Sequence, residues 1–177
     1  MRKAVLLLIA LAAALTAQAQ RFGYIDSQVI IEQMPEYKEA EDNLRKLSDE
    51  WTRDLKKMRD EVEDLEIGYK TEELLLTQDM KEERQKEIRG KREEIRRYQA
   101  NHFGYEGLLF IKRKEMIKPI QDKIAKAATK VAKSKRLQFL FDKASDLTMI
   151  YSDPRHNYTD FVLEELGLGD PSDTPKK

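Results

Sequence analysis

The chain has 177 residues, with 33 basic residues, 33 acidic residues and no cysteine. A formal net charge of zero argues against a nucleic-acid-binding protein, which would carry a clear basic excess. The lack of cysteine excludes disulfides and a lipid-modified cysteine as an anchor, and it suits a protein exported to an oxidising compartment.

The first 19 residues have the pattern of a secretory signal peptide. Arg2 and Lys3 give a positive start, residues 4–15 form an apolar run, and Ala17-Gln18-Ala19 is a small-x-small cleavage signal. We therefore expect cleavage after Ala19. The alternative is a single membrane anchor, but this run is shorter than the roughly 20 apolar residues that span a bilayer. The mature protein is expected to be soluble and periplasmic.

A charge-dense helical stretch runs without interruption from Glu36 to Lys118, between Pro35 and Pro119. Its midpoint is Thr77, so we expect an antiparallel helical hairpin with its tip near that residue and 41 residues in each arm. At roughly 1.5 Å of rise per residue, each arm would be about 60 Å long. The remainder of the chain is too small to cover such arms, so they are expected to project into solvent.

The apolar residues of the first arm form one narrow seam. They recur at steps of three and four residues, which is the spacing of a coiled-coil contact. The seam consists of Tyr37, Ala40, Leu44, Leu47, Trp51, Leu55, Met58, Val62, Leu65 and Tyr69. The apolar residues of the second arm are less regular, so we expect a loose coil.

The hairpin predicts which residues of the two arms face each other. With a turn at Thr77, the numbers of facing residues add up to about 154, which places Trp51 near Phe103 and Leu44 near Phe110. The first arm has 8 basic and 14 acidic residues and the second has 12 basic and 8 acidic residues. The arms should therefore attract each other, although exposed ion pairs contribute only a few tenths of a kcal/mol each.

Four glycines lie inside the arms, and each costs a helix about 1 kcal/mol relative to alanine. Gly68 and Gly90 are also compatible with tolerated substitutions on an exposed surface. Gly104 and Gly107 form a closer pair, at which we expect a hinge.

Residues 20–35 and 119–167 are predicted to form a small base, and residues 168–177 a polar, disordered tail. We expect a strand over 21–25, followed by a helix capped by Asp26 or Ser27. A helix over 119–134 should bury Ile120, Ile124, Ala127, Ala128 and Val131. Strands over 137–141 and 147–151 should follow, and then a helix that is capped by Thr159 or Asp160 and ended by Gly167. The fold class is α+β, mostly helical. A three-stranded sheet of this size has open edges, which neighbouring subunits are expected to cover.

The ordered set of these features resembles the Skp/OmpH family of periplasmic chaperones. The resemblance covers essentially the whole mature chain. It rests on the leader, Phe22-Gly23-Tyr24-Ile25-Asp26-Ser27, Met34-Pro35-Glu36-Tyr37, the charged hairpin, Leu137-Gln138-Phe139-Leu140-Phe141-Asp142 and Tyr158-Thr159-Asp160-Phe161-Val162.

The resemblance implies a homotrimer whose helical hairpins, like tentacles, enclose an unfolded outer-membrane β-barrel protein and prevent its aggregation without ATP or any cofactor. The trimerisation body would include Phe22, Tyr24, Ile25, Leu137, Phe139, Phe141, Met149 and Tyr151. The candidates for contact with the client are Trp51, Met58, Tyr98 and Phe103. The rival hypothesis is a structural coiled-coil spacer or envelope adaptor that binds one folded partner, and the interrupted seam counts against it.

The formal net charge of the mature chain is 31 − 33 = −2, whereas the best-known members of that family are strongly basic. A local excess of basic residues nevertheless begins on the second arm, where it could contact acidic clients or anionic lipid. We call it the basic collar: Lys112, Arg113, Lys114, Lys118, Lys123 and Lys126. The alternative is a solvated helix face that balances the acidic first arm.

The sequence contains no pattern that indicates an enzyme. His102 and His156 are the only histidines and lie far apart, so we expect both at the surface, with no metal site and no catalytic residues. Neutral charge and export both argue against a nucleic-acid partner.

Overall fold

The computed structural model describes residues 21–145 and 149–169. The predicted leader, the residues at positions 146–148 and the tail beyond Gly169 lie outside the described residues. The described chain divides into two compact units. We call Pro35–Ile120 the hairpin unit, and residues 21–34 with 121–169 the base.

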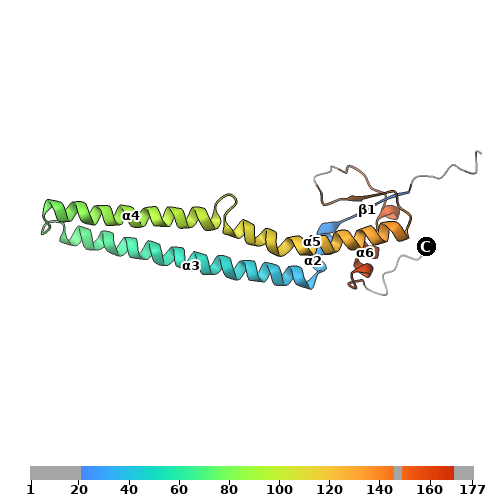
Figure 1. The fold of residues 1–177 in the computed structure, drawn as a ribbon, viewed down its shortest axis with the longest axis horizontal. Coiled ribbons are helices and arrows are strands. Elements are labelled where there is room, and N and C mark those ends of the chain that lie inside the picture. The colour runs from blue at the N-terminus through green and yellow to red at the C-terminus, as the bar shows by residue number, and fades with distance from the viewer. Residues whose placement is uncertain (1–20, 146–148, 170–177) are drawn as a thin grey trace, which may run out of the picture. The chain divides into compact units, whose positions relative to one another are not determined.

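The hairpin unit is built on two long antiparallel helices, α3 (Pro35–Glu72) and α4 (Gln78–Phe103), which lie side by side in Figure 1. Pro35 is the first residue of α3, where its missing N–H costs nothing. Thr77 caps α4, because its hydroxyl accepts a hydrogen bond from the Met80 N–H at 3.4 Å. The chain therefore reverses direction between Glu72 and Thr77.

Apolar burial between the helices is thin. Four of the ten seam residues on α3 are buried, namely Ala40, Leu44, Leu55 and Val62, whereas α4 buries only Ile88 among its described side chains. The other six seam residues are half-buried. A coil with so little buried apolar surface is held weakly, since hydrophobic stabilisation scales with the area removed from water.

The second arm is interrupted, so the prediction of an uninterrupted stretch was wrong. The helix α4 ends at Phe103 and α5 (Leu108–Ser134) begins after a tight loop. A β-carbon at Gly104 would lie 2.3 Å from the Ala100 carbonyl oxygen, and Glu106 has a φ of 56°. The loop therefore depends on local conformations that a continuous helix does not allow.

The helix α5 continues through Pro119 into the base. A proline inside a helix removes one backbone hydrogen bond and crowds the carbonyl four residues earlier, which ordinarily kinks or breaks the helix. The chain nevertheless stays helical on both sides of Pro119. In the base, α5 buries Ile124, Ala127, Ala128 and Val131, as their spacing predicted. This stripe forms one side of the small core of the base.

The sheet of the base has two parallel strands, β1 (Phe22–Ile25) and β2 (Phe139–Asp142). Their register pairs Phe22 with Phe139 and Ile25 with Asp142. The hairpin unit lies between β1 and β2 in the sequence, although these two strands are adjacent in the sheet.

The described part of the predicted third strand does not form. Met149, Ile150 and Tyr151 are not paired with any described strand, and the Leu147 and Thr148 positions lie outside the described residues. A different segment reaches the free side of β1, where Tyr24 forms an isolated parallel bridge with Asn157. The open edge of β1 is thus partly covered by its own chain.

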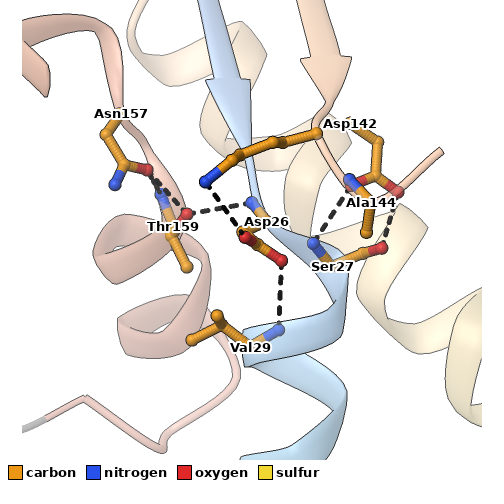
Figure 2. Close-up of polar contacts among 8 residues, drawn as sticks. Asp26, Ser27, Val29, Asp142, Ala144, Asn157 and Thr159 are labelled. Carbon is orange, nitrogen blue, oxygen red and sulfur yellow. Dashed lines mark hydrogen bonds and ion pairs between the residues drawn. The ribbon is translucent and has the colours of Figure 1, made fainter. Parts of the chain in front are cut away.

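The end of β1 is joined to β2 by side-chain hydrogen bonds (Figure 2). Asp26 caps α2 (Ser27–Gln33), since its carboxylate accepts from the Val29 N–H at 3.3 Å, as expected. The backbone N–H and hydroxyl of Ser27 both donate to the Asp142 carboxylate, at 3.1 and 2.6 Å. These charge-assisted bonds hold β2 against the start of α2.

The last helix, α6 (Thr159–Glu165), begins differently from the prediction. Thr159 does not cap it, because its hydroxyl accepts from the Asp26 N–H at 3.0 Å and donates to the Asn157 side chain at 2.6 Å. Asn157 satisfies the Thr159 N–H instead, at 3.0 Å. Gly167 ends the helix with a φ of 76°, as predicted.

Candidate interaction surfaces

Four aromatic side chains form a cluster between α3 and α4. The rings of Trp51 and Phe103 meet edge to face with centroids 6.2 Å apart, as the predicted register requires. His102 lies 4.8 Å from the Trp51 ring and stacks on Tyr98 at 3.9 Å. Three of the four predicted client-contact residues are therefore packed against one another, and the fourth, Met58, is half-buried on α3.

His102 was expected at the surface with no particular role, and it lies at the centre of this cluster instead. One nitrogen of its ring is 2.9 Å from the Tyr98 carbonyl oxygen. The four-residue spacing of Tyr98 and His102 was the available signal, because residues four apart are neighbours on a helix. The Tyr98 hydroxyl lies 3.5 Å from the Asp54 carboxylate, and partial burial together with that negative charge raises the pKa of Tyr98.

The most exposed apolar side chains of the hairpin unit lie elsewhere. One group, which we call the tip patch, surrounds the turn and consists of Ile67, Leu74, Leu75 and Met80. The other, which we call the elbow patch, surrounds the glycine loop and consists of Tyr105, Leu108, Phe110 and Ile111. Leu74, Leu75 and Tyr105 are 96%, 86% and 97% exposed. Sequence reasoning missed both groups, because it chose its client-contact candidates among residues of the seam and of the facing arm and did not weigh the apolar residues near the turn and the glycine loop.

Ion pairs link the two sides of the hairpin unit. Arg92 lies 2.7 Å from Glu66, and Lys91 lies 3.5 Å from Glu61. These pairs are exposed, so salt screens them and they set register more than stability. Within α4, hydrogen bonding to Arg96 lowers the pKa of Glu93.

The basic collar lies along α5. Lys112 lies 2.8 Å from Glu115, and Arg113 lies 3.9 Å from Glu41. Arg113, Lys114, Lys118, Lys123 and Lys126 are exposed. Part of the collar therefore balances acidic residues of the chain itself.

The sheet of the base exposes aromatic side chains. Phe22 and Phe139 are 51% and 56% exposed, Phe139 stacks on Phe141 at 6.3 Å, and Phe22 stacks on His156 at 4.8 Å. These rings belong to the body predicted to form the trimer.

An open cavity of about 560 Å³ lies beside these rings. Its lining includes Phe22, Tyr24, Phe141, Met149, Tyr151 and His156. Of the remaining predicted body residues, Ile25 is buried in the core and Leu137 is half-buried. Six of the eight predicted residues thus lie on the exposed aromatic face.

Among the described residues, no group of three histidine or acidic side chains is placed to hold a metal ion. Within the same part of the chain, none of the helices is both long enough and apolar enough to cross a membrane.

Comparisons with known proteins agree with this architecture. A family model described as "Outer membrane protein (OmpH-like)" matches residues 21–166. A crystal structure from Caulobacter crescentus CB15, provisionally described as an outer membrane chaperone (OmpH-like), superposes with a TM-score of 0.70 at 12% identity and covers 84% of this chain and 85% of that chain. At that identity the likeness shows a shared fold. A search of curated proteins found no match. Because the family model matches most of its length, the chain belongs to the OmpH-like family.

Proposed function

We propose that this protein is an ATP-independent holding chaperone of the periplasm, which binds unfolded outer-membrane β-barrel proteins and prevents their aggregation. Membership of the OmpH-like family supports the class of function. The observation that carries the proposal is the exposure of large apolar side chains at two places on the hairpin unit. Contiguous exposed apolar groups mark sites of protein interaction in soluble proteins.

Holding an unfolded chain requires many weak contacts rather than one specific pocket. The tip patch and the elbow patch each offer four apolar side chains, and charged residues of both signs lie along the helices between them. Several hairpins acting on one client would raise the overall affinity through effective concentration. Trp51, Met58, Tyr98 and Phe103 are proposed as further contacts when the hairpin opens, since they are packed or half-buried when it is closed.

We further propose that the active form is a homotrimer assembled through the base. The exposed rings of Phe22, Phe139 and Phe141 form an apolar face that copies of the same base would cover. The two-stranded sheet and its short helices bury only a small core, and small domains are marginal without such assembly. The predicted leader would bring the chain to the periplasm.

The experiment is to dilute a urea-unfolded β-barrel outer-membrane protein into buffer with and without the purified mature chain. We expect light scattering from aggregates to fall as the chaperone is added, with complete suppression near one trimer per client. Unchanged aggregation at that ratio would contradict the proposal. Capture of a single folded envelope protein from a periplasmic extract, without suppression of aggregation, would favour the spacer or adaptor hypothesis.

A further inference from the structure

A second surface of the base has a different chemistry. An open cleft of about 630 Å³ lies between the end of α5 and the segment that leads into α6. Its charged and aromatic lining residues are Arg21, Lys135, Arg136, Arg155, Asp160 and Phe161. Four cations thus share one cleft with a single carboxylate.

The four cations of the cleft differ in whether another residue of the protein neutralises them. Arg155 pairs with Asp153 at 2.6 Å, so these two charges cancel. The Lys135 ammonium lies 3.7 Å above the Phe161 ring, which orients the group without neutralising it. Arg21 and Arg136 are exposed, and neither guanidinium forms an ion pair with a carboxylate of the described residues. Arg21, Lys135 and Arg136 against Asp160 leave 3 − 1 = +2 in the cleft.

The backbone of Arg136 gives an independent indication that its side chain has a role. Arg136 has a φ of 54° and follows the end of α5, in the position where a helix ordinarily takes glycine. The motif is complete, because the Leu137 N–H donates to the Ala132 carbonyl at 2.8 Å and the Arg136 N–H to that of Lys133 at 3.2 Å. An arginine is strained there and glycine is not. The Arg136 guanidinium forms no ion pair with the described residues, so no such contact compensates for the backbone strain.

Arg21 is held on the same cleft by the backbone. Its carbonyl accepts a hydrogen bond from the Gln138 N–H at 2.8 Å, which ties the residue before β1 to the segment after Arg136. Arg21 and Arg136, which are far apart in the sequence, therefore line the same cleft.

We propose that this cleft binds the phosphate group of a phosphorylated ligand. Two planar guanidinium forks match the oxygens of a phosphate, and the neighbouring ammonium adds a point charge. A phosphomonoester carries nearly two negative charges at neutral pH, equal to the excess in the cleft. A carboxylate would neutralise only half of it. The phosphate can belong to a small soluble compound or to a lipid headgroup, and both sources present the same chemistry.

The test compares wild type with Arg136→Gly in the full mature chain. Isothermal titration with inorganic phosphate and with glycerol phosphate measures the soluble source. Co-sedimentation with phosphatidylcholine vesicles containing one fifth phosphatidic acid measures the lipid source. We expect binding of at least one source by the wild type, weakened at least tenfold in Arg136→Gly and further weakened by added salt. The melting temperature of Arg136→Gly should equal or exceed that of the wild type, because glycine relieves the backbone.

Lys46→Ala is the control, since Lys46 is an exposed cation of α3 that belongs neither to the cleft nor to the basic collar. Its affinity should stay within twofold of the wild type. Arg21→Ala provides a second cleft variant and should also lose at least tenfold, which keeps the test valid if Arg136→Gly folds poorly. No binding to either source, or equal losses in Lys46→Ala and the cleft variants, would overturn the proposal. The holding assay uses no phosphate ligand, so it can fail or succeed independently of this result.

Discussion

The indole of Trp51 on α3 meets the imidazole of His102 on α4 edge to face, with ring centroids 4.8 Å apart. Tyr98 stacks on the same imidazole with centroids 3.9 Å apart, and Phe103 meets the indole edge to face. Because the buried apolar surface elsewhere along the seam is thin, we expect much of the cohesion of the hairpin unit to come from this cluster.

Replacing Trp51 with alanine should therefore open the hairpin unit. We expect a loss of roughly 2–3 kcal/mol of unfolding free energy, less than the about 3–5 kcal/mol typical of a buried tryptophan, because Trp51 is half-buried. Urea denaturation followed by far-ultraviolet circular dichroism measures it. Lys57→Ala, at an exposed position of the same helix, should change the free energy by less than about 0.5 kcal/mol. Similar losses of unfolding free energy in both variants would contradict a large contribution of the aromatic cluster to stability.

The tip patch should contribute to client holding but not to folding. The double variant Leu74→Ser with Leu75→Ser removes two nearly fully exposed side chains, so the melting temperature should stay within about 2 °C of the wild type. Its affinity for an unfolded client should fall roughly tenfold, since partial burial of two leucines contributes on the order of 1–2 kcal/mol.

The matched control for the tip patch keeps the apolar surface. Leu74→Met with Leu75→Met should hold the client as well as the wild type does. Affinity is measured by fluorescence anisotropy of a labelled, urea-unfolded β-barrel protein. If the serine and methionine pairs bind equally well, the tip patch is not a client contact.

Two glycines of the second arm should respond in opposite ways to alanine. A β-carbon at Gly104 would lie 2.3 Å from the Ala100 carbonyl oxygen, so Gly104→Ala must distort the loop and lower the melting temperature. Gly90 lies inside α4 with no atom within 4 Å of its β-carbon position, so Gly90→Ala should stabilise the helix by about 1 kcal/mol. Differential scanning calorimetry of both variants checks the pair. A stabilised Gly104→Ala would mean that the loop is not required.

The ion pair between Asp153 and Arg155 predicts a specific acid dependence. Hydrogen bonds from Arg155 lower the pKa of the Asp153 carboxyl to about 2. Both the folded and the unfolded carboxyl are ionised above the ordinary pKa of about 3.9, so the stabilisation is complete there and disappears as the pH falls to about 2. The difference in melting temperature between wild type and Asp153→Asn should be constant down to about pH 4 and vanish near pH 2. A carbon-detected NMR titration with a midpoint near 4 would contradict the assignment.

The sequence predicted the local parts of this fold well. The Asp26 cap, Pro35 at the start of α3, the Gly167 terminus and the facing of Trp51 and Phe103 all follow from short-range rules or from helix periodicity. The match of the family model also confirmed the resemblance to OmpH-like proteins.

The features that the sequence did not predict depend on contacts between distant residues. Thr159 does not cap α6 because its hydroxyl is engaged by the Asp26 N–H, 133 residues earlier in the chain. The free side of β1 is met at Asn157 rather than by the predicted third strand. The pair Gly104 and Gly107 did indicate an interruption of the second arm, but the positive φ of Glu106 in that loop could not be read from the sequence.

The proposed trimer can be tested through the aromatic face of the base. Phe139→Ser with Phe141→Ser removes two exposed rings from it, so we expect size-exclusion chromatography with light scattering to give the mass of a monomer instead of that of a trimer. Lys133→Ser, at an exposed polar position of α5, should leave the mass unchanged. A wild-type protein that is monomeric at micromolar concentration would contradict the proposed assembly.

Site-specific cross-linking from the two exposed patches tests the central claim most directly. A photoreactive amino acid is placed at Leu75, at Tyr105 and, as a control, at the exposed Lys57, and each chain is irradiated with an unfolded β-barrel protein and with the same protein folded in detergent. We predict strong cross-links from Leu75 and Tyr105 to the unfolded client, weak ones from Lys57, and none to the folded protein. Equal yields from all three positions, or equal yields with the folded and unfolded client, would contradict the account.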